Sequence, residues 1–356
     1  MNINLKHISQ FALRWLLGGV FVFSGLVKCV DPVGTSIFVE KYLATYSLEA
    51  ILYLALPIAV LLATLEVVLG ILLIIGVLRK YVTLSTTILL FIFTVVTLLS
   101  ATVLPIGDCG CFGDAVKLTP WQTFAKNVVL LTVAIWLLRN TEDRPHAWSR
   151  VVVVVVAAVA LPLVVNLYSL RYLPLVDFLS YKVDVDLRTA VAGERESDDV
   201  KSILIFKDIA TGETLEFPAD DTACWINPDI EYVDARTVTT RNSEGEFADF
   251  AIYNNDGEDV SLELLNRRGR VAWLCVNDIE ALDGTRLQYV ERLFEAYPEH
   301  AVVVLTASDR AFVSRRLGRE VHNVDAMTLR SMMRADVGVV VINDGVIEYK
   351  ADIRDI

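Results

Sequence analysis

Five long apolar runs fill the first half of the chain, and short polar segments separate them. They lie at about residues 10–30, 51–78, 82–104, 120–138 and 150–170. Each run is long enough to span a bilayer, because a spanning helix needs about 20 apolar residues. The first run follows Lys6, but it is longer than a signal-peptide core and lacks an A-x-A cleavage site. The pattern predicts five transmembrane helices, the first of them uncleaved.

The second half carries shorter apolar segments, which predict an α/β domain. Residues 203–207 and 214–217 predict a β-hairpin, and the polar residues 173–200 before it predict a linker or lead-in. Strands and helices then alternate and end in a second hairpin. The expected strands are 250–253, 271–276, 301–306, 337–342 and 346–350, and the expected helices lie near 287–297, 308–317 and 325–333.

Charge separates the same two halves. Residues 1–172 contain 12 Lys and Arg against 8 Asp and Glu, which leaves 20 basic and 36 acidic residues for 173–356. The net charges are therefore +4 and −16. The acidic half argues against nucleic acid as a partner, because phosphates need a basic face.

The basic residues also predict the orientation in the membrane. Lys and Arg gather at the N-terminal end and after the second and fourth runs, at Lys6, Arg14, Arg79, Lys80, Arg139, Arg144 and Arg150. Because basic residues favour the cytoplasmic side, we expect a cytoplasmic N-terminus in a bacterial inner membrane. The segments 31–50 and 105–119, and everything after residue 172, then face the periplasm.

The outer segment between the third and fourth runs carries Cys109-Gly110-Cys111. Two cysteines two positions apart bridge only where a turn brings their Cα atoms within about 7 Å, and Gly110 permits such a turn. A ring this small is strained, and strained disulfides are the reducible ones. In an oxidising compartment, the pair indicates redox chemistry.

Two other interpretations of this turn stay open. A structural staple would stabilise little, because stabilisation grows with the length of the closed loop. A metal site would need about four ligands, and here only Asp108 and Asp114 accompany the thiols. We therefore predict no metal site.

The other three cysteines carry less information. Cys29 lies at the outer end of the first run and is either a third thiol near the turn or a packed small residue. Cys275 lies within an apolar strand, which favours packing. Cys224 fits no pattern.

Glu66 lies deep inside the second apolar run. A carboxylate at that depth is costly unless it is paired or protonated, and is by default a functional candidate. An ion pair with Arg14, or a role in proton or quinone chemistry, would explain it. Lys126 and Arg14 are each close enough to a helix end for the side chain to extend to the interface.

At these residues the chain resembles known membrane families. The segment 14–28, together with Pro57, Glu66 and Gly70, resembles DoxX-type proteins, and the segment 108–113 resembles the MauE branch of methylamine-utilisation proteins. The resemblance covers about residues 8–140. It implies a four-helix bundle that takes part in extracytoplasmic thiol–disulfide chemistry or in electron transfer at the quinone pool.

The order of elements from residue 249 resembles a TlpA-like thioredoxin fold. No C-x-x-C occurs in the chain, residues 277–283 contain no cysteine, and Val337 occupies the usual position of a cis-proline. Without a thiolate there is no nucleophile for disulfide exchange. We therefore expect a thioredoxin-like domain without redox activity.

These observations predict an α-helical membrane bundle followed by an α/β thioredoxin-like domain. The expected boundaries are a DoxX/MauE-like four-helix domain at 1–145, a fifth transmembrane helix at 146–172, a linker and hairpin at 173–248, and the degenerate thioredoxin-like domain at 249–356. The first functional hypothesis is a thiol–disulfide or quinone-linked oxidoreductase using Cys109, Cys111 and Glu66. Its partners would be lipid, quinone and an extracytoplasmic thiol or redox protein, without a covalently bound cofactor. The alternative is a non-enzymatic accessory protein that docks an extracytoplasmic partner through its soluble domain.

Overall fold

The computed structural model describes most of the 356 residues. The described residues are 2–103, 113, 115–116, 118–142, 147–196, 199–209, 211–218, 222–225, 227–240, 247 and 250–356. Cys109 and Cys111 therefore lie outside the described residues.

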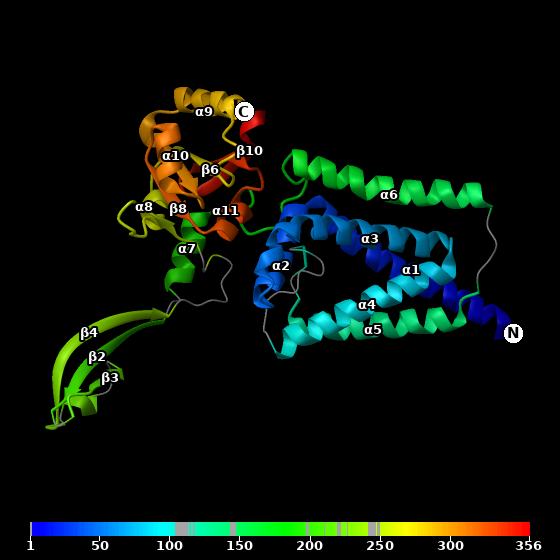
Figure 1. Ribbon diagram of the computed structural model, residues 1–356, viewed down its shortest axis with the longest axis horizontal. Helices are drawn as coiled ribbons and strands as arrows, with labels where there is room; N and C mark the ends of the chain where they lie inside the picture. Colours follow the sequence, from blue (N-terminus) through cyan, green and yellow to red (C-terminus); the bar gives the residue numbers. More distant parts are fainter. Residues whose placement is uncertain are drawn as a thin grey trace.

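Five long apolar helices form the membrane bundle, as the sequence predicted (Figure 1). They are α1 (Asn2–Val30), α3 (Ala55–Ile75), α4 (Arg79–Thr102), α5 (Pro120–Asn140) and α6 (Trp148–Arg171). Thr119 caps α5 in a capping box with Gln122, and Pro120 occupies the first turn. The predicted boundaries of the membrane helices were therefore close to the observed ones.

The segment 31–50 contains helical structure that the sequence analysis did not predict. The helix α2 (Pro32–Thr45) begins directly after α1, and the short 3₁₀ helix η1 (Glu49–Leu54) leads into α3. Asp31 starts α2 by accepting a hydrogen bond from the Gly34 backbone nitrogen at 2.7 Å. The chain thus turns sharply between α1 and α2 at a capped position.

Small residues allow α1 and α3 to pack closely. A Cβ atom on Gly18 would lie 2.8 Å from the Gly70 carbonyl oxygen, and one on Gly25 would lie 2.8 Å from the Ala63 carbonyl oxygen. Such contacts between small residues are typical of helix pairs in membranes. They fix the register of the two antiparallel helices, which decides what lies opposite Glu66.

The C-terminal part is an α/β domain built on a six-stranded sheet with the order β10-β9-β6-β7-β8-β5. The strands are β5 (Ile252–Tyr253), β6 (Arg270–Val276), β7 (Val302–Thr306), β8 (Val321–Val324), β9 (Val337–Asn343) and β10 (Val346–Asp352). β6 runs parallel to β7 and antiparallel to β9, which pairs with β10. The helices are α8 (Ser261–Leu265), α9 (Gly284–Ala296), α10 (Arg310–Leu317) and α11 (Ala326–Met332). The predicted alternation and final hairpin are present, and the short strand β8 was missed.

Residues 173–200, expected as a linker or lead-in, contribute to this domain. They contain α7 (Leu187–Glu196), whose Leu187 and Val191 are buried in the same apolar cluster as Trp273. The backbone nitrogen of Leu187 also donates to the Gly345 carbonyl oxygen at 2.9 Å. The sequence pattern gave little sign of this packing, because Leu187 and Val191 are the only large apolar side chains of α7.

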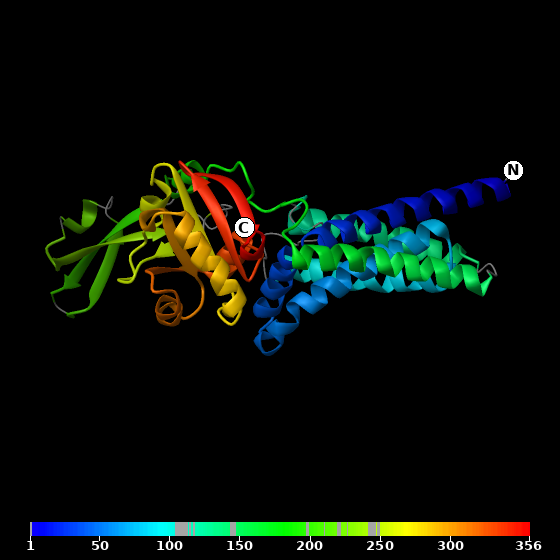
Figure 2. The same ribbon diagram turned by 90° about the horizontal axis from the view of Figure 1, so that it is seen from above.

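A separate three-stranded sheet extends away from the domain, on the side far from the bundle (Figures 1 and 2). It has the order β3-β2-β4, formed by β2 (Asp199–Asp208), β3 (Thr214–Pro218) and β4 (Ile230–Thr240). The first two strands are the predicted hairpin, and β4 was not predicted. A small aromatic cluster of Phe206, Phe217, Trp225 and Tyr232 packs on one face.

The α/β domain lies at one end of the bundle, and the N-terminus of α1 lies at the other (Figure 2). The helix α2 lies at the same end as the domain (Figure 1). An odd number of long helices produces this arrangement, because α6 returns the chain to the end at which α1 finishes.

Candidate functional site

A buried ion pair joins α1 to α3 inside the bundle. The Lys28 ammonium donates to both Glu66 carboxylate oxygens, at 2.6 and 2.7 Å, and to the Ser24 hydroxyl at 2.9 Å. The Lys28 and Glu66 side chains are only 8% and 2% exposed. All three ammonium hydrogens therefore have acceptors, as a charge buried in an apolar surrounding requires.

The ion pair between Glu66 and Arg14, one of the explanations suggested by the sequence, is not formed. Arg14 lies beside Gly76 at the opposite end of α3, where a Cβ on that glycine would meet the guanidinium at 2.7 Å. Ten residues of helix, about 15 Å, separate Gly76 from Glu66. Lys28 takes the place beside the carboxylate because α1 and α3 are antiparallel.

The pair lies on the wall of an apolar cavity of about 380 Å³. Its lining is shared by α1 to α5 and is largely aliphatic and aromatic, with polar side chains in a minority. The polar and charged lining residues are Ser24, Lys28, Thr35, Tyr42, Glu66, Thr97, Lys126 and Asn127. Apolar pockets with a few convergent polar groups are the usual form of small-molecule sites.

Three of these polar residues come from α4 and α5, namely Thr97, Lys126 and Asn127. Asn127 on α5 is buried, and its side-chain nitrogen donates to the Thr97 hydroxyl of α4 at 3.4 Å. Lys126, for which an interfacial position was one expectation, lines the same cavity. The sequence analysis did not single out Asn127 or Thr97, because an amide and a hydroxyl in an apolar run give a weaker signal than a charge.

Gly113 indicates where the chain goes after the Cys-Gly-Cys segment. It is buried, and a Cβ atom there would lie 3.3 Å from a methyl carbon of Val27. Val27 directly precedes Lys28, so the residue two positions after Cys111 lies beside the C-terminal end of α1. The structure thus brings Gly113 next to the helix that carries the buried lysine.

The three cysteines that the structure describes are buried and unbridged. The Asn166 side-chain nitrogen of α6 donates to the Cys29 sulfur at 3.2 Å. Burial raises the pKa of Cys275 to about 12. Cys224 packs in the small core of the three-stranded sheet. The packing role predicted for Cys275 agrees with this burial, because a thiol with so high a pKa forms almost no thiolate at neutral pH.

The first residue after β6, in the segment 277–283 that contains no cysteine, is an asparagine with a structural role. The Asn277 side-chain nitrogen donates to the Met333 and Ala335 carbonyl oxygens at 2.7 and 2.8 Å. Among the described residues there is no cis peptide bond and no cluster of three or more metal-ligating side chains. This end of β6 therefore holds the chain before β9 in place and offers no exchangeable thiol.

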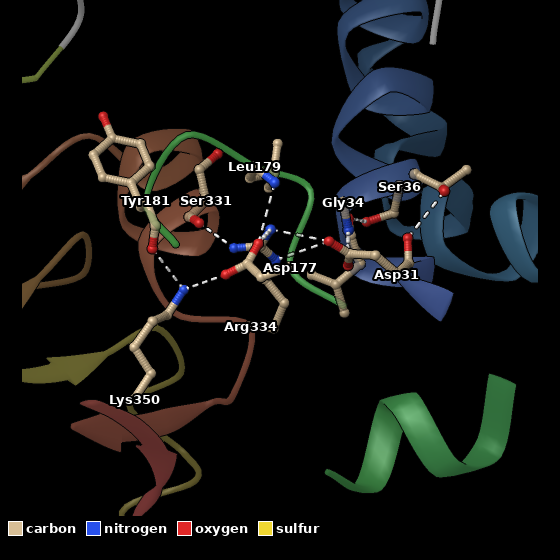
Figure 3. A network of polar contacts seen from close by, with 11 residues as sticks. Asp31, Gly34, Ser36, Asp177, Leu179, Tyr181, Ser331, Arg334 and Lys350 are labelled. Carbon is tan, nitrogen blue, oxygen red and sulfur yellow. Dashed lines mark hydrogen bonds and ion pairs between the residues drawn. The ribbon is translucent and has the colours of Figure 1, made fainter. Parts of the chain in front are cut away.

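A second polar cluster joins the α/β domain to the bundle (Figure 3). Arg334, which follows α11, donates to Asp31 at 2.9 and 3.1 Å and to Asp177 at 3.0 Å. Lys350 on β10 donates to the other Asp177 oxygen at 2.6 Å. Despite burial, these cations hold the pKa of Asp177 below its usual value. No sequence pattern pointed to this cluster.

Comparison with known proteins agrees with the membrane part of this description. Residues 6–140 match the family described as methylamine utilisation protein MauE. The chain is also 29% identical over 168 residues to Protein TlpB of Flavobacterium psychrophilum, a match that covers 45% of this chain and 44% of that relative. The chain thus spans less than half the length of that curated relative, and no solved structure matches it. The five apolar helices and these matches support a multi-pass membrane protein whose residues 6–140 are similar to the MauE family.

Proposed function

We propose that this membrane protein transfers electrons between thiols on the outer face of the membrane and a lipid-soluble quinone. Cys109 and Cys111 are the proposed thiol pair, and the cavity beside Lys28 and Glu66 is the proposed quinone site. The observation that carries the proposal is the cavity itself, which combines an apolar lining with a few polar groups at membrane depth.

The chemistry of the lining suits a quinone. The ring and isoprenoid tail need apolar surroundings, which Phe21, Leu62 and Phe93 among others supply. The carbonyl oxygens need hydrogen-bond donors, and the amide of Asn127 lies in the cavity wall. Glu66 supplies a carboxylate that can exchange a proton when the quinone is reduced.

The proposed reaction balances in electrons and protons. The Cys109–Cys111 dithiol loses two electrons and two protons and forms one S–S bond, while the quinone gains both and becomes a quinol. An external dithiol then reduces the Cys109–Cys111 disulfide through a mixed disulfide and leaves as a disulfide, which restores the reduced pair. Neither direction of flow needs a bound metal or a covalently attached group.

Reconstituted full-length protein provides the test. The reduced protein is placed in liposomes with and without a short-tailed quinone, and mass-shift trapping follows the oxidation of Cys109 and Cys111. We expect quinone-dependent disulfide formation with one quinol formed per disulfide.

Two tryptophan variants make this test specific for the cavity. Val96→Trp should slow the reaction at least tenfold, because Val96 lines the cavity. Val95→Trp is the matched control, because Val95 is 40% exposed on the outside of the same helix. A pair that stays reduced with quinone present, or equal rates in both variants, would contradict the proposal.

A docking function is the second candidate, and the α/β domain favours it. Residues 277–283 offer no thiol, and Cys275 is completely buried. Such a domain acts through its surface and not through disulfide exchange. Full retention of the biological function in a Cys109→Ser/Cys111→Ser variant would favour docking over the redox proposal.

A further inference from the structure

The outer end of α1 contacts three other parts of the protein within four residues. Lys28 pairs with Glu66 on α3, Cys29 accepts from Asn166 on α6, and Asp31 binds Arg334 of the α/β domain. Three residues of helix correspond to about 4.5 Å. Because so short a segment separates the two residues, a displacement of Asp31 is transmitted to Lys28 and its buried ion pair.

Asp31 holds its place by using both carboxylate oxygens. One accepts from the Gly34 backbone nitrogen and so caps α2, and the other accepts from two nitrogens of Arg334. The Asp31 and Arg334 side chains are 8% and 3% exposed. Removing one member of such a buried pair leaves the other charge uncompensated, which is far more costly than losing an exposed pair.

Asp177 closes the cluster from the other side. It follows α6, accepts from Arg334 and Lys350, and so ties the exit of the last membrane helix to the same arginine (Figure 3). The Lys350 ammonium also donates to the Tyr181 carbonyl oxygen at 2.9 Å. Two carboxylates and two cations balance within the cluster, so that Arg334 fixes the ends of α1 and α6 together.

A second link between the domain and the bundle provides a natural comparison. Arg330 on α11 forms a two-pronged ion pair with Glu40 on α2. It has the same chemistry as the Arg334–Asp31 contact and comes from almost the same place in the domain. It differs in one respect, because Glu40 lies within α2, whereas Asp31 directly follows the last residue of α1.

We infer that Arg334 is a positioning residue for the membrane site, and that the α/β domain uses it to hold the outer end of α1 in place. The domain thus affects the Lys28–Glu66 ion pair without contacting it. The inference concerns the geometry of α1, and it draws on the proposed redox function only for the second measurement below.

The first measurement uses Cys29 as a reporter in the full-length protein in its membrane. Cys29 is completely buried beside Asn166, so its alkylation by N-ethylmaleimide, followed by mass spectrometry of the Cys29 peptide, reports opening at this end of α1. We expect Arg334→Gln to raise the rate at least tenfold. Asp31→Asn should do the same, because asparagine retains the cap of α2 but not the charge. Arg334→Lys should restore most of the protection.

Arg330→Gln is the matched control and should leave the Cys29 rate within about twofold of the wild type. An equal rise in Arg330→Gln and Arg334→Gln would mean that general docking protects Cys29, and it would overturn the inference. Unchanged rates in both Arg334→Gln and Asp31→Asn would also overturn it. Asp31→Asn leaves the sequence of the α/β domain intact, so that a folding defect of that domain cannot produce its effect.

The second measurement asks whether this positioning reaches the proposed thiol pair. Mass-shift trapping of Cys109 and Cys111 in thiol–disulfide buffers should show a change of about tenfold in the equilibrium constant for Arg334→Gln, or about 30 mV for a two-electron couple. Arg330→Gln should cause no such change. If no reversible disulfide forms in the wild type, the redox proposal fails while the Cys29 result still decides the positioning role. If the disulfide forms and Arg334→Gln leaves its constant unchanged, the α/β domain does not act on the thiol pair.

Discussion

Replacing Lys28 and Glu66 by methionine, singly and together, tests the central feature of the bundle. Each single variant leaves one charge inside the bundle without its partner. The double variant removes both charges and fills the space with unbranched apolar side chains of similar length. The three variants form a double-mutant cycle, which isolates the interaction between the two side chains.

The expected magnitudes follow from the burial of the pair. In Glu66→Met, the Lys28 ammonium loses the acceptors at 2.6 and 2.7 Å and keeps only Ser24. Breaking a buried pair in this way costs about 3–5 kcal/mol, whereas replacing both members is often neutral or stabilising. We therefore expect each single variant to lose about 3 kcal/mol, and the double variant to lie within about 1 kcal/mol of the wild type.

The assay is reversible unfolding of the full chain in mixed micelles, followed by circular dichroism. Quinone-dependent oxidation of the thiol pair is measured in parallel. If the pair takes part in the proposed chemistry, the double variant recovers stability and remains inactive. If the pair is only structural, activity returns with stability. Single-variant losses that simply add in the double variant would refute the coupling and the geometry behind it.

Three further predictions concern the α/β domain and the topology. Burial raises the pKa of Cys275 to about 12, so Cys275 should resist N-ethylmaleimide at pH 8 in the native chain and react fully after denaturation. Insulin reduction that depends on Cys275 would contradict its packing role. Burial also lowers the pKa of His322, so the unfolded chain binds this proton first as the pH falls below about 6.5. The thermal midpoint of unfolding should therefore decrease as the pH is lowered from 7 to 5.5, and His322→Gln should make this decrease smaller. An unchanged pH dependence of the midpoint in this variant would exclude His322 as the cause. Cysteines placed at Lys41 and Asp229 should react with an impermeant reagent in spheroplasts while one at Lys80 does not, and protection at 229 would contradict the expected orientation.

The long membrane helices could be predicted from the sequence because apolar length alone determines them. The helix α2 could not, because its residues show no single apolar face. Phe38, Val39 and Tyr42 line the cavity, while Glu40 meets Arg330 of the α/β domain. A helix covered on two sides by different partners lacks the one-sided periodicity that identifies a surface helix.

The site could be predicted only in part. Glu66 was recognisable because a carboxylate in an apolar run is exceptional. Its partner depended on the register between α1 and α3, which the contacts of Gly18 with Gly70 and of Gly25 with Ala63 set. Lys28 is close enough to a helix end to be taken for an interfacial residue. Its charge alone therefore did not show whether its side chain lies at the membrane interface or inside the bundle.

The contact between the two halves of the protein runs against their overall charges. The membrane half has a net charge of +4 and the soluble half of −16, yet at the contact Asp31 and Glu40 come from the bundle and Arg330 and Arg334 from the acidic domain. General attraction would bring together a basic bundle and any acidic face of the domain. The local reversal selects instead the face on which Arg330 and Arg334 lie opposite these carboxylates. Because an unpaired buried charge is costly, a rotated domain would lose both ion pairs at once. The same reversal made the contact hard to predict. Asp31 lies in the half with a net positive charge and Arg334 in the half with a net negative charge, so the overall charges predict partners of the opposite sign to those observed. In addition, the two residues are 303 positions apart in the sequence.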